Sequence, residues 1–177
     1  MRYTVGACGI KWEFVGRRCL PASFHRRVNV EHMFLGQFTH SIDTKGRITI
    51  PVRFRAALSS GAYVTQGFER NLIVYTTKSF ERLAQRASTL TTTDPDVRAV
   101  MRVIFGRASE VSLDSSGRIL VPPFLRDYAH LEGESVLVGA GQYFEIWSGE
   151  AWEQELASVV DPEINARRFT TFDLSTG

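Results

Sequence analysis

Hydrophobic and polar positions along the chain fall into two similar series, one starting near residue 34 and the other near residue 108. Segment 42–51 reads IDTKGRITIP and segment 113–122 reads LDSSGRILVP, so Asp, Gly, Arg, Ile and Pro recur at an offset of 71 residues. The similarity continues at an offset of 72, where residues 64–67 correspond to 136–139. A match of this length indicates an internal duplication.

The same succession of elements is expected in each repeat. A strand with apolar residues at every second position runs into a tight Asp-x-x-Gly-Arg turn, and a second strand ending in proline follows. The proline suits the first turn of a short helix because its fixed φ fits there. Two more strands and an amphipathic helix complete the repeat. The expected helices lie at 52–59, 78–87, 123–128 and 150–159, and the expected later strands at 62–66, 72–76, 135–139 and 143–147.

Four residues are expected to shape the two turns, which we interpret as β-hairpins. Gly46 and Gly117 supply the positive φ that such a turn requires. Asp43 and Asp114 can accept backbone N–H bonds across it. For the two aspartates and the two glycines, the pattern alone favours this purely structural role.

The repeats predict a mainly β fold with short helices, an α+β chain whose barrel is built from two pseudo-symmetric halves. One half alone would expose too much sheet edge to be stable, so the halves are expected to pair. Residues 1–32 show no clear period, and we interpret them as an extension, disordered or upstream of a natural start at Met33. The remaining boundaries are 33–87 for the first repeat, 88–107 for a linker with a helix at 96–105, 108–160 for the second repeat and 161–177 for a tail.

Charge and cysteine content restrict the function classes. The net charge of +2 combines +4 in residues 1–32 with −2 in the remainder, so any nucleic-acid surface on the body must be local. Both cysteines lie in the extension, and no apolar run approaches the roughly 20 residues of a membrane span. With no convincing export signal, these features favour the cytoplasm and exclude a membrane partner.

Enzyme and metal motifs are weak. Cys8, Cys19, His25 and His32 have ten, five and six intervening residues, unlike the spacing of a zinc site, so no metal is expected. A G-x-S-x-G elbow and a phosphate-binding loop are both missing from the sequence. We therefore expect no enzymatic activity, no cofactor and no small-molecule substrate.

The two Asp-x-x-x-Arg motifs, each followed by an Ile-x-[Ile/Val]-Pro strand end, resemble those of the MraZ family, relatives of the AbrB-type swapped-hairpin regulators. The resemblance covers roughly residues 33–160. It implies a double-split β-barrel and a homo-oligomeric ring, with eight subunits as the family's assembly. It also implies a nucleoid-associated transcriptional repressor that binds double-stranded DNA. Its sites would be direct repeats upstream of the division and cell-wall gene cluster, including its own promoter.

In this family the first hairpin reads DNA, which carries over to Lys45 and Arg47. The physics agrees, because a two-stranded ribbon fits the major groove and arginine pairs bidentately with guanine. Lysine suits phosphate, and Arg53 and Arg55 on the following helix are expected to hold the DNA backbone. For Arg118 two roles stay open, a DNA contact or a structural pairing with Asp114 or a neighbour.

The second repeat is less basic, because Ser116 replaces Lys45 and Phe124 replaces Arg53. Phe124 suggests that this face of the second repeat is buried, in a subunit contact for example. Two other readings compete with a DNA-binding regulator. A protein-interaction module of the antitoxin-like barrel type would lack salt-dependent DNA binding, and an enzyme would need the motifs that are missing.

Overall fold

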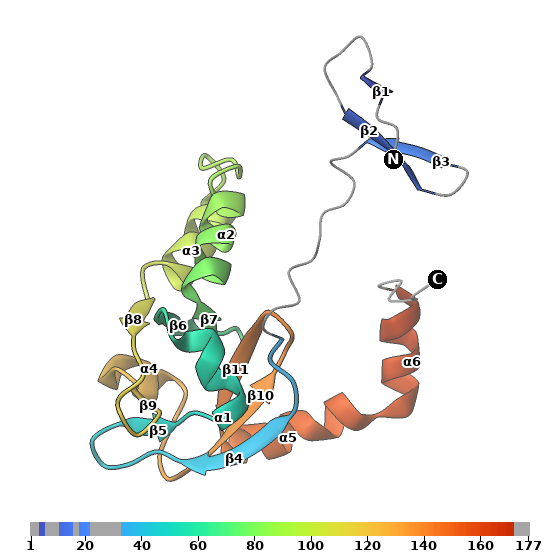
Figure 1. Ribbon diagram of the computed structural model, residues 1–177. Coiled ribbons are helices and arrows are strands. Elements are labelled where there is room, and N and C mark those ends of the chain that lie inside the picture. Colours follow the sequence, from blue (N-terminus) through green and yellow to red (C-terminus); the bar gives the residue numbers. More distant parts are fainter. Residues whose placement is uncertain (1–3, 6–10, 16–17, 22–32, 172–177) are drawn as a thin grey trace. The chain divides into compact units, whose positions relative to one another are not determined.

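The computed structural model describes residues 4–5, 11–15, 18–21 and 33–171 (Figure 1). The chain divides into two compact units, Met1–Glu31 and His32–Gly177. The first unit contains strands β1 (Thr4–Val5), β2 (Lys11–Val15) and β3 (Arg18–Pro21), which pair antiparallel in that order. Sequence patterning did not predict these strands, because segments of two to five residues are too short to establish a period.

The second unit contains both repeats and most expected elements within a residue or two. The first repeat comprises β4 (Gln37–Ser41), β5 (Arg47–Thr49), α1 (Val52–Arg55), the 3-10 turn η2 (Ala56–Leu58), β6 (Ala62–Gln66), β7 (Leu72–Thr76) and α2 (Thr77–Ala87). The second comprises β8 (Ser109–Val111), β9 (Arg118–Leu120), α4 (Pro123–Tyr128), β10 (Glu134–Gly139), β11 (Tyr143–Ser148) and α5 (Gly149–Val160). The helix α3 (Pro95–Ile104) lies between them, with Asp94 as its N-cap.

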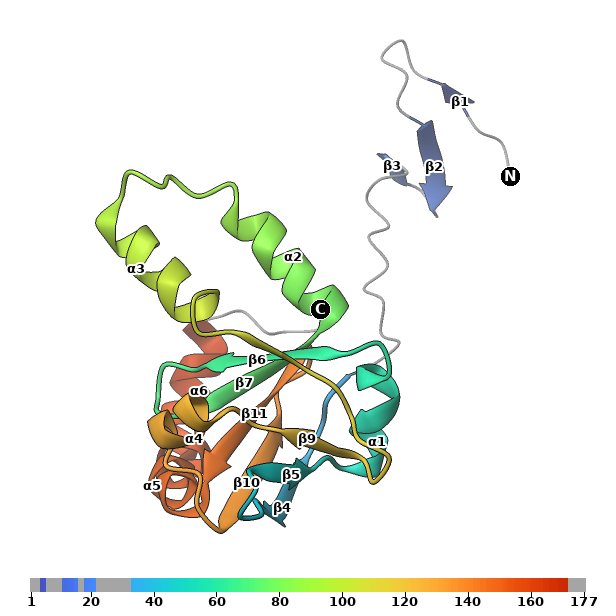
Figure 2. The same ribbon diagram turned by 90° about the vertical axis from the view of Figure 1, so that its left-hand side faces the viewer.

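One six-stranded antiparallel sheet, in the order β4-β10-β11-β7-β6-β8, carries strands of both repeats. Its pseudo-twofold axis lies between β11 and β7, where the repeats pair from Tyr143↔Tyr75 to Ile146↔Leu72. The remaining strands, β5 and β9, form a separate two-stranded ribbon (Figure 2). The expectation that the halves pair is confirmed.

Strand partners differ from the expected hairpins. We predicted that the strands flanking each turn would pair with each other, but β4 pairs with β10, β8 pairs with β6, and β5 pairs with β9. Within the first repeat, only the isolated bridge Ile42↔Ile48 joins the two arms of the turn. The prediction was wrong because the turn residues fix the backbone over only a few positions. Which strand each one pairs with along its length depends instead on how the strands bury the common core.

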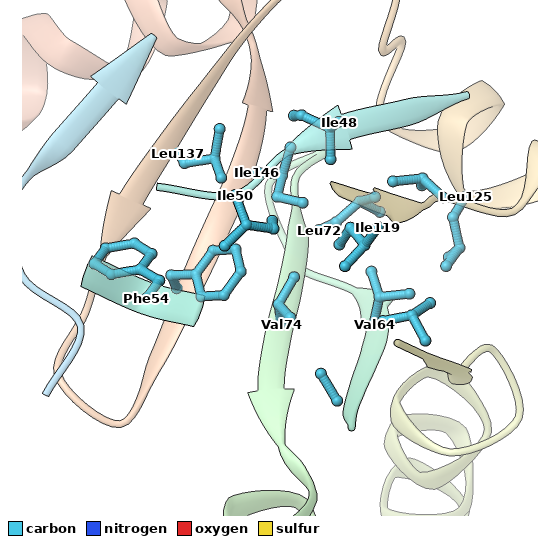
Figure 3. Packing of buried hydrophobic residues seen from close by; sticks show 14 of the residues in the cluster. Ile48, Ile50, Phe54, Val64, Leu72, Val74, Ile119, Leu125, Leu137 and Ile146 are labelled. Carbon is cyan, nitrogen blue, oxygen red and sulfur yellow. The ribbon is translucent and has the colours of Figure 1, made fainter. Parts of the chain in front are cut away.

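One hydrophobic core lies between the sheet and the ribbon and contains residues of both repeats (Figure 3). Ile48 and Ile119, at equivalent positions of the ribbon, are 0% and 1% exposed. Phe54 of α1 and Leu125 of α4 are also equivalent and buried. The two short helices therefore close the core in the same way, and the structure confirms the predicted fold class, a mainly β double-split barrel with two pseudo-symmetric repeats.

Helices cover the outer face of the sheet. The pair α2 and α3 stands on the β6–β7 side (Figures 1 and 2), where Phe80 stacks on Tyr63 and the Thr65 hydroxyl donates to the Ile104 carbonyl at 2.7 Å. Trp152 of α5 packs on Trp147 over β10 and β11. The segment expected as a tail contains a further helix, α6 (Pro162–Thr171). The sequence did not predict this helix because its amphipathic pattern is weak. Among the described helices none has the length and apolar character of a membrane span.

Candidate nucleic-acid interface

The turn between β4 and β5 is organised by Asp43. Its Oδ1 accepts the backbone N–H of Lys45 at 3.0 Å and that of Arg47 at 2.9 Å. Gly46 donates its N–H to the Asp43 carbonyl at 2.8 Å and has a φ of 80°. In this turn the carboxylate caps the backbone donors and glycine tolerates the left-handed conformation, which is the geometry that a turn-shaping role of Asp43 and Gly46 requires.

The turn between β8 and β9 repeats this geometry. Asp114 Oδ1 accepts the N–H groups of Ser116 at 2.8 Å and Arg118 at 3.0 Å. Gly117 donates to the Asp114 carbonyl at 2.9 Å with a φ of 74°. Asp114 and Gly117 therefore have the same capping geometry in the second repeat.

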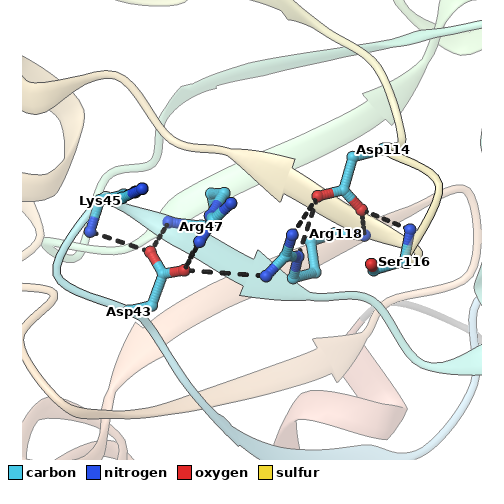
Figure 4. Close-up of polar contacts among 6 residues, drawn as sticks. All are labelled: Asp43, Lys45, Arg47, Asp114, Ser116 and Arg118. Atoms are coloured by element: carbon cyan, nitrogen blue, oxygen red, sulfur yellow. Dashed lines mark hydrogen bonds and ion pairs between the residues drawn. The ribbon is translucent and has the colours of Figure 1, made fainter.

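Each aspartate also binds the arginine that ends its turn (Figure 4). Arg47 places Nε and Nη2 each 2.7 Å from Asp43 Oδ2. Arg118 places Nε 2.9 Å and Nη2 2.8 Å from Asp114 Oδ2, and its Nη1 lies 3.9 Å from Asp43 Oδ2. The structure thus brings Arg47 and Arg118 together on one ribbon, and both arginines have the carboxylate pairing that the sequence suggests only for Arg118.

The ribbon has one face on the core and one facing away. Its register is Arg47↔Leu120, Ile48↔Ile119 and Thr49↔Arg118. Since Ile48 and Ile119 are buried, the alternation of a strand turns the other residues outward. The outward face consists of Arg47, Thr49, Arg118 and Leu120. Sequence reasoning missed Thr49 and Leu120, although the period-two pattern that places Ile48 and Ile119 in the core also places these two residues on the opposite face.

Charge in this surface is balanced within each pair. Hydrogen bonds from the Arg47 side chain and backbone lower the pKa of Asp43 from 3.8 to about 2. The equivalent bonds from Arg118 lower the pKa of Asp114. Both carboxylates are therefore ionised at neutral pH, and each arginine is a held cation rather than a mobile one. Lys45 at the turn is exposed, and the described residues place no carboxylate within ion-pair distance of its ammonium.

Arg55 occupies an intramolecular position that the sequence did not anticipate. Its Nε donates to the Ile50 carbonyl at 2.8 Å, and its guanidinium lies where a Cβ on Gly117 would be. Arg126, the equivalent residue of the second repeat, covers Gly46 in the same way. Each arginine thus packs on the turn of the other repeat, so the expected phosphate contact of Arg55 competes with a structural role.

Arg53 and Phe124, at equivalent positions, are both exposed. The Arg53 guanidinium lies 5.3 Å from the centroid of the Phe38 ring, a distance that allows a cation–π contact. Phe124 is 38% exposed and has Arg107 over its ring at 5.2 Å. The expectation that Phe124 is buried is not met within one chain, because the short helix α4 turns Leu125 inward instead.

Candidate metal ligands need only a short account. The set Cys8, Cys19, His25 and His32 lies outside the residues whose side chains are described. In the part of the chain that the structure describes, His, Cys, Asp and Glu side chains form no group of three or more that could hold an ion.

Comparison with known proteins adds the family. Residues 33–103 and 104–172 each match the family described as "MraZ protein, putative antitoxin-like". A protein of Thermomicrobium roseum named "Transcriptional regulator MraZ" is 48% identical over 141 residues, which are 78% of this chain and 99% of that protein. Proteins with the same name are 43% identical in Herpetosiphon aurantiacus, over 73% of this chain and 90% of theirs, and 43% identical in Dictyoglomus thermophilum, over 69% and 84%. These relatives carry the name of a regulator and not that of an enzyme.

Proposed function

This chain belongs to the MraZ family of transcriptional regulators, which are not enzymes, and on that premise we propose that it is a repressor that binds double-stranded DNA directly. Its sites are direct repeats upstream of the division and cell-wall gene cluster, including its own promoter. It acts on the nucleoid in the cytoplasm. The proposal rests above all on the outward face of the β5–β9 ribbon, where two arginines are held side by side.

The carboxylates prepare the arginines for this task. Asp43 binds the Nε and Nη2 groups of Arg47, which engages one edge of the guanidinium. The Nη1 group has no hydrogen-bond acceptor among the described residues, and the Nη1–Nη2 edge suits the O6 and N7 acceptors of guanine. A guanidinium fixed before binding loses less rotamer entropy on binding, so this pairing favours specificity.

Neighbouring cations supply contacts that do not depend on sequence. Lys45, in the turn that precedes β5, and Arg53, in the helix α1 that follows it, are both exposed cations of the first repeat. Both suit phosphate oxygens, which position a protein on DNA without reading its bases. The second repeat has Ser116 and Phe124 there, so the phosphate contacts belong mainly to the first repeat.

One ribbon with so few cations binds DNA weakly at physiological salt, because counterion release scales with the number of phosphates contacted. Several ribbons on one ring can engage neighbouring repeats together, which raises avidity by about 10² or more. We therefore propose a closed homo-oligomeric ring, of eight subunits by family resemblance. Binding then requires at least two repeats at a spacing that the ring can span. Sedimentation of a monomer at micromolar concentration would contradict the ring.

A footprint of the full chain on the DNA upstream of its own gene, at several salt concentrations, tests the proposal. Gel shifts on one, two and three repeats then compare wild type with Arg47→Ala, Arg118→Ala and Arg86→Ala. Arg86 is an exposed arginine of α2, so its substitution is a charge-matched control away from the ribbon. We expect Arg47→Ala to abolish specific binding with an unchanged oligomer, and Arg118→Ala to reduce binding less and stability more.

Two results would count against this assignment. If Arg47→Ala retains specific binding, or if Arg118→Ala is the more damaging to it, the wrong repeat has been given the main base contact. If the wild-type chain leaves no footprint and shows no salt-dependent binding, the barrel is instead a protein-interaction module.

A further inference from the structure

The β5–β9 ribbon has a local twofold axis that passes through the Ile48–Ile119 pair. The axis relates Arg47 to Arg118 and exchanges the two flanking cross-strand pairs of the register. Backbone bonds obey it as well, since Ile50 donates to the Gly117 carbonyl at 2.9 Å and Val121 donates to the Gly46 carbonyl at 2.9 Å. The backbone of the ribbon and its two held arginines therefore look alike in two orientations that differ by half a turn.

The ribbon backbone and its two arginines cannot by themselves tell the two ends of a DNA site apart. The proposed phosphate contacts of Lys45 and Arg53 differ between the repeats, but phosphate contacts do not read bases. Direct repeats all point the same way, so a ring that reads them needs an asymmetric feature in each ribbon. The outward face has one such difference at equivalent positions, because Thr49 in the first repeat is Leu120 in the second. The distinction is between a small, partly polar side chain and a larger, wholly apolar one.

Leu120 has no packing role in the described part of the chain that would explain its type. It is 58% exposed, whereas its neighbours Ile119 and Val121 are 1% and 0% exposed and belong to the core. Leu120 lies directly across from Arg47, and side chains opposed in this way have Cβ atoms about 5 Å apart. An exposed apolar group thus lies on the same face of the ribbon, directly opposite the arginine that is proposed to read guanine.

We propose that Leu120 is a specificity-determining residue that contacts the C5-methyl group of a thymine beside the guanine read by Arg47. This inference rests on the DNA-binding function proposed above. The thymine methyl is the apolar group that B-DNA offers in the major groove, and its contact with leucine removes apolar surface of both from water. Thr49 next to Arg118 provides less apolar surface, so the contact marks one end of the site and gives the ribbon a direction.

Deoxyuridine, which differs from thymidine only by this methyl, provides the test. Each thymine of the footprinted repeats is replaced in turn, and the affinity of the full chain is measured with wild type, Leu120→Thr and Leu35→Thr. Leu120→Thr installs the residue of the equivalent position, and Leu35, 53% exposed outside the ribbon, is the matched control. We expect one thymine per repeat, on one side of the guanine only, whose replacement weakens binding by wild type and Leu35→Thr about three- to fivefold per repeat. Leu120→Thr should be indifferent to that replacement.

Other outcomes overturn the inference in distinguishable ways. If uracil at every position affects wild type and Leu120→Thr equally while Arg47→Ala still loses binding, the DNA-binding function stands and the role of Leu120 is refuted. The same holds if sensitive thymines occur symmetrically at both ends, or if Leu120→Thr changes the mass of the oligomer, which would place Leu120 in a subunit contact. If wild type lacks specific binding altogether, the proposed function fails first.

Discussion

At the scale of single residues, Asp43 and Asp114 each perform two tasks with one carboxylate. One oxygen caps the backbone donors of the turn and the other binds the arginine that ends it. Turn conformation and arginine position are therefore coupled, and a change in either aspartate affects both.

The lowered pKa of Asp43 leads to a titration experiment. Carboxyl carbon NMR should show Asp43 titrating near 2, and Arg47→Gln should raise its pKa toward the ordinary 3.8, because the main stabilising hydrogen bond is lost. Arg53→Gln, which removes an exposed cation that makes no hydrogen bond or ion pair with Asp43, is the control and should leave the titration unchanged. An unaltered Asp43 pKa in Arg47→Gln would show that the pairing is absent in solution.

The same pKa shift predicts how stability depends on pH. A carboxyl whose pKa is lower in the folded state than in the unfolded chain contributes its full stability above the unfolded value of about 3.8. That contribution is lost as the pH falls through about 2. Urea unfolding between pH 6 and 2 should show a decline below pH 4 that is shallower in Asp43→Asn, whose overall stability is lower. An equal slope in both proteins would contradict the linkage.

At the scale of elements, the two turns are connected to the two short helices by Arg55 and Arg126, which cross between repeats. Arg55, the last residue of α1 in the first repeat, lies on Gly117 of the second, and Arg126 in α4 lies on Gly46 of the first. A Cβ at either glycine would overlap the guanidinium, so the arginine would have to shift from its packed position. This overlap adds to the effect of the positive φ, which already favours glycine there.

Alanine substitutions can separate the effect of the positive φ from the effect of arginine packing on the glycine. Gly133 has a φ of 70°, and the Cβ of an alanine there would have no other atom within 4 Å. Gly133→Ala should therefore cost only about 1 kcal/mol of backbone strain. Gly117→Ala has a similar φ and also collides with Arg55, so denaturant unfolding should show a loss larger by about 1 kcal/mol or more. Arg55→Ala should recover part of that excess in the Gly117→Ala background. Equal losses for the two glycines would show that Arg55 moves aside freely.

At the scale of the whole molecule, the first unit and the two-repeat unit are separate bodies. We expect a chain starting at Met33 to fold, assemble and bind DNA as the full chain does, because the core is built from residues 34–146. Thermal melting and sedimentation of both chains check this. A loss of several degrees in melting temperature, or a smaller oligomer, would show that the N-terminal unit contributes.

Exchange of strands makes the two repeats interdependent. In the described structure β4 forms its ladder with β10, and β5 forms its ladder with β9, so the first repeat alone leaves both strands without partners. Residues 33–107 by themselves should therefore show no cooperative melting as a monomer, and mixing with residues 108–177 should restore it. Circular dichroism melts with sedimentation check both statements. A cooperative monomeric melt of residues 33–107 would contradict them.

The amino-acid sequence by itself determined the features that depend on neighbouring residues. Both Asp-x-x-Gly-Arg turns have the expected capping bonds and positive φ values, because these involve groups at most four residues apart. Strands β6 and β7 and helix α4 lie at the predicted residues, because their alternation and flanking turns are local signals. The duplication also predicted a paired, two-repeat barrel.

Only the tertiary structure decided which strands pair across the repeats and what each arginine touches. Ile48 and Ile119 are 71 residues apart, and their pairing follows from burying one shared core, which no local pattern encodes. That pairing placed Arg47, Arg118 and Leu120 on one face, and it packed Arg55 on Gly117. Since β5 and β9 have only three residues each, their own period is too short to select a partner, and the fold as a whole makes that choice.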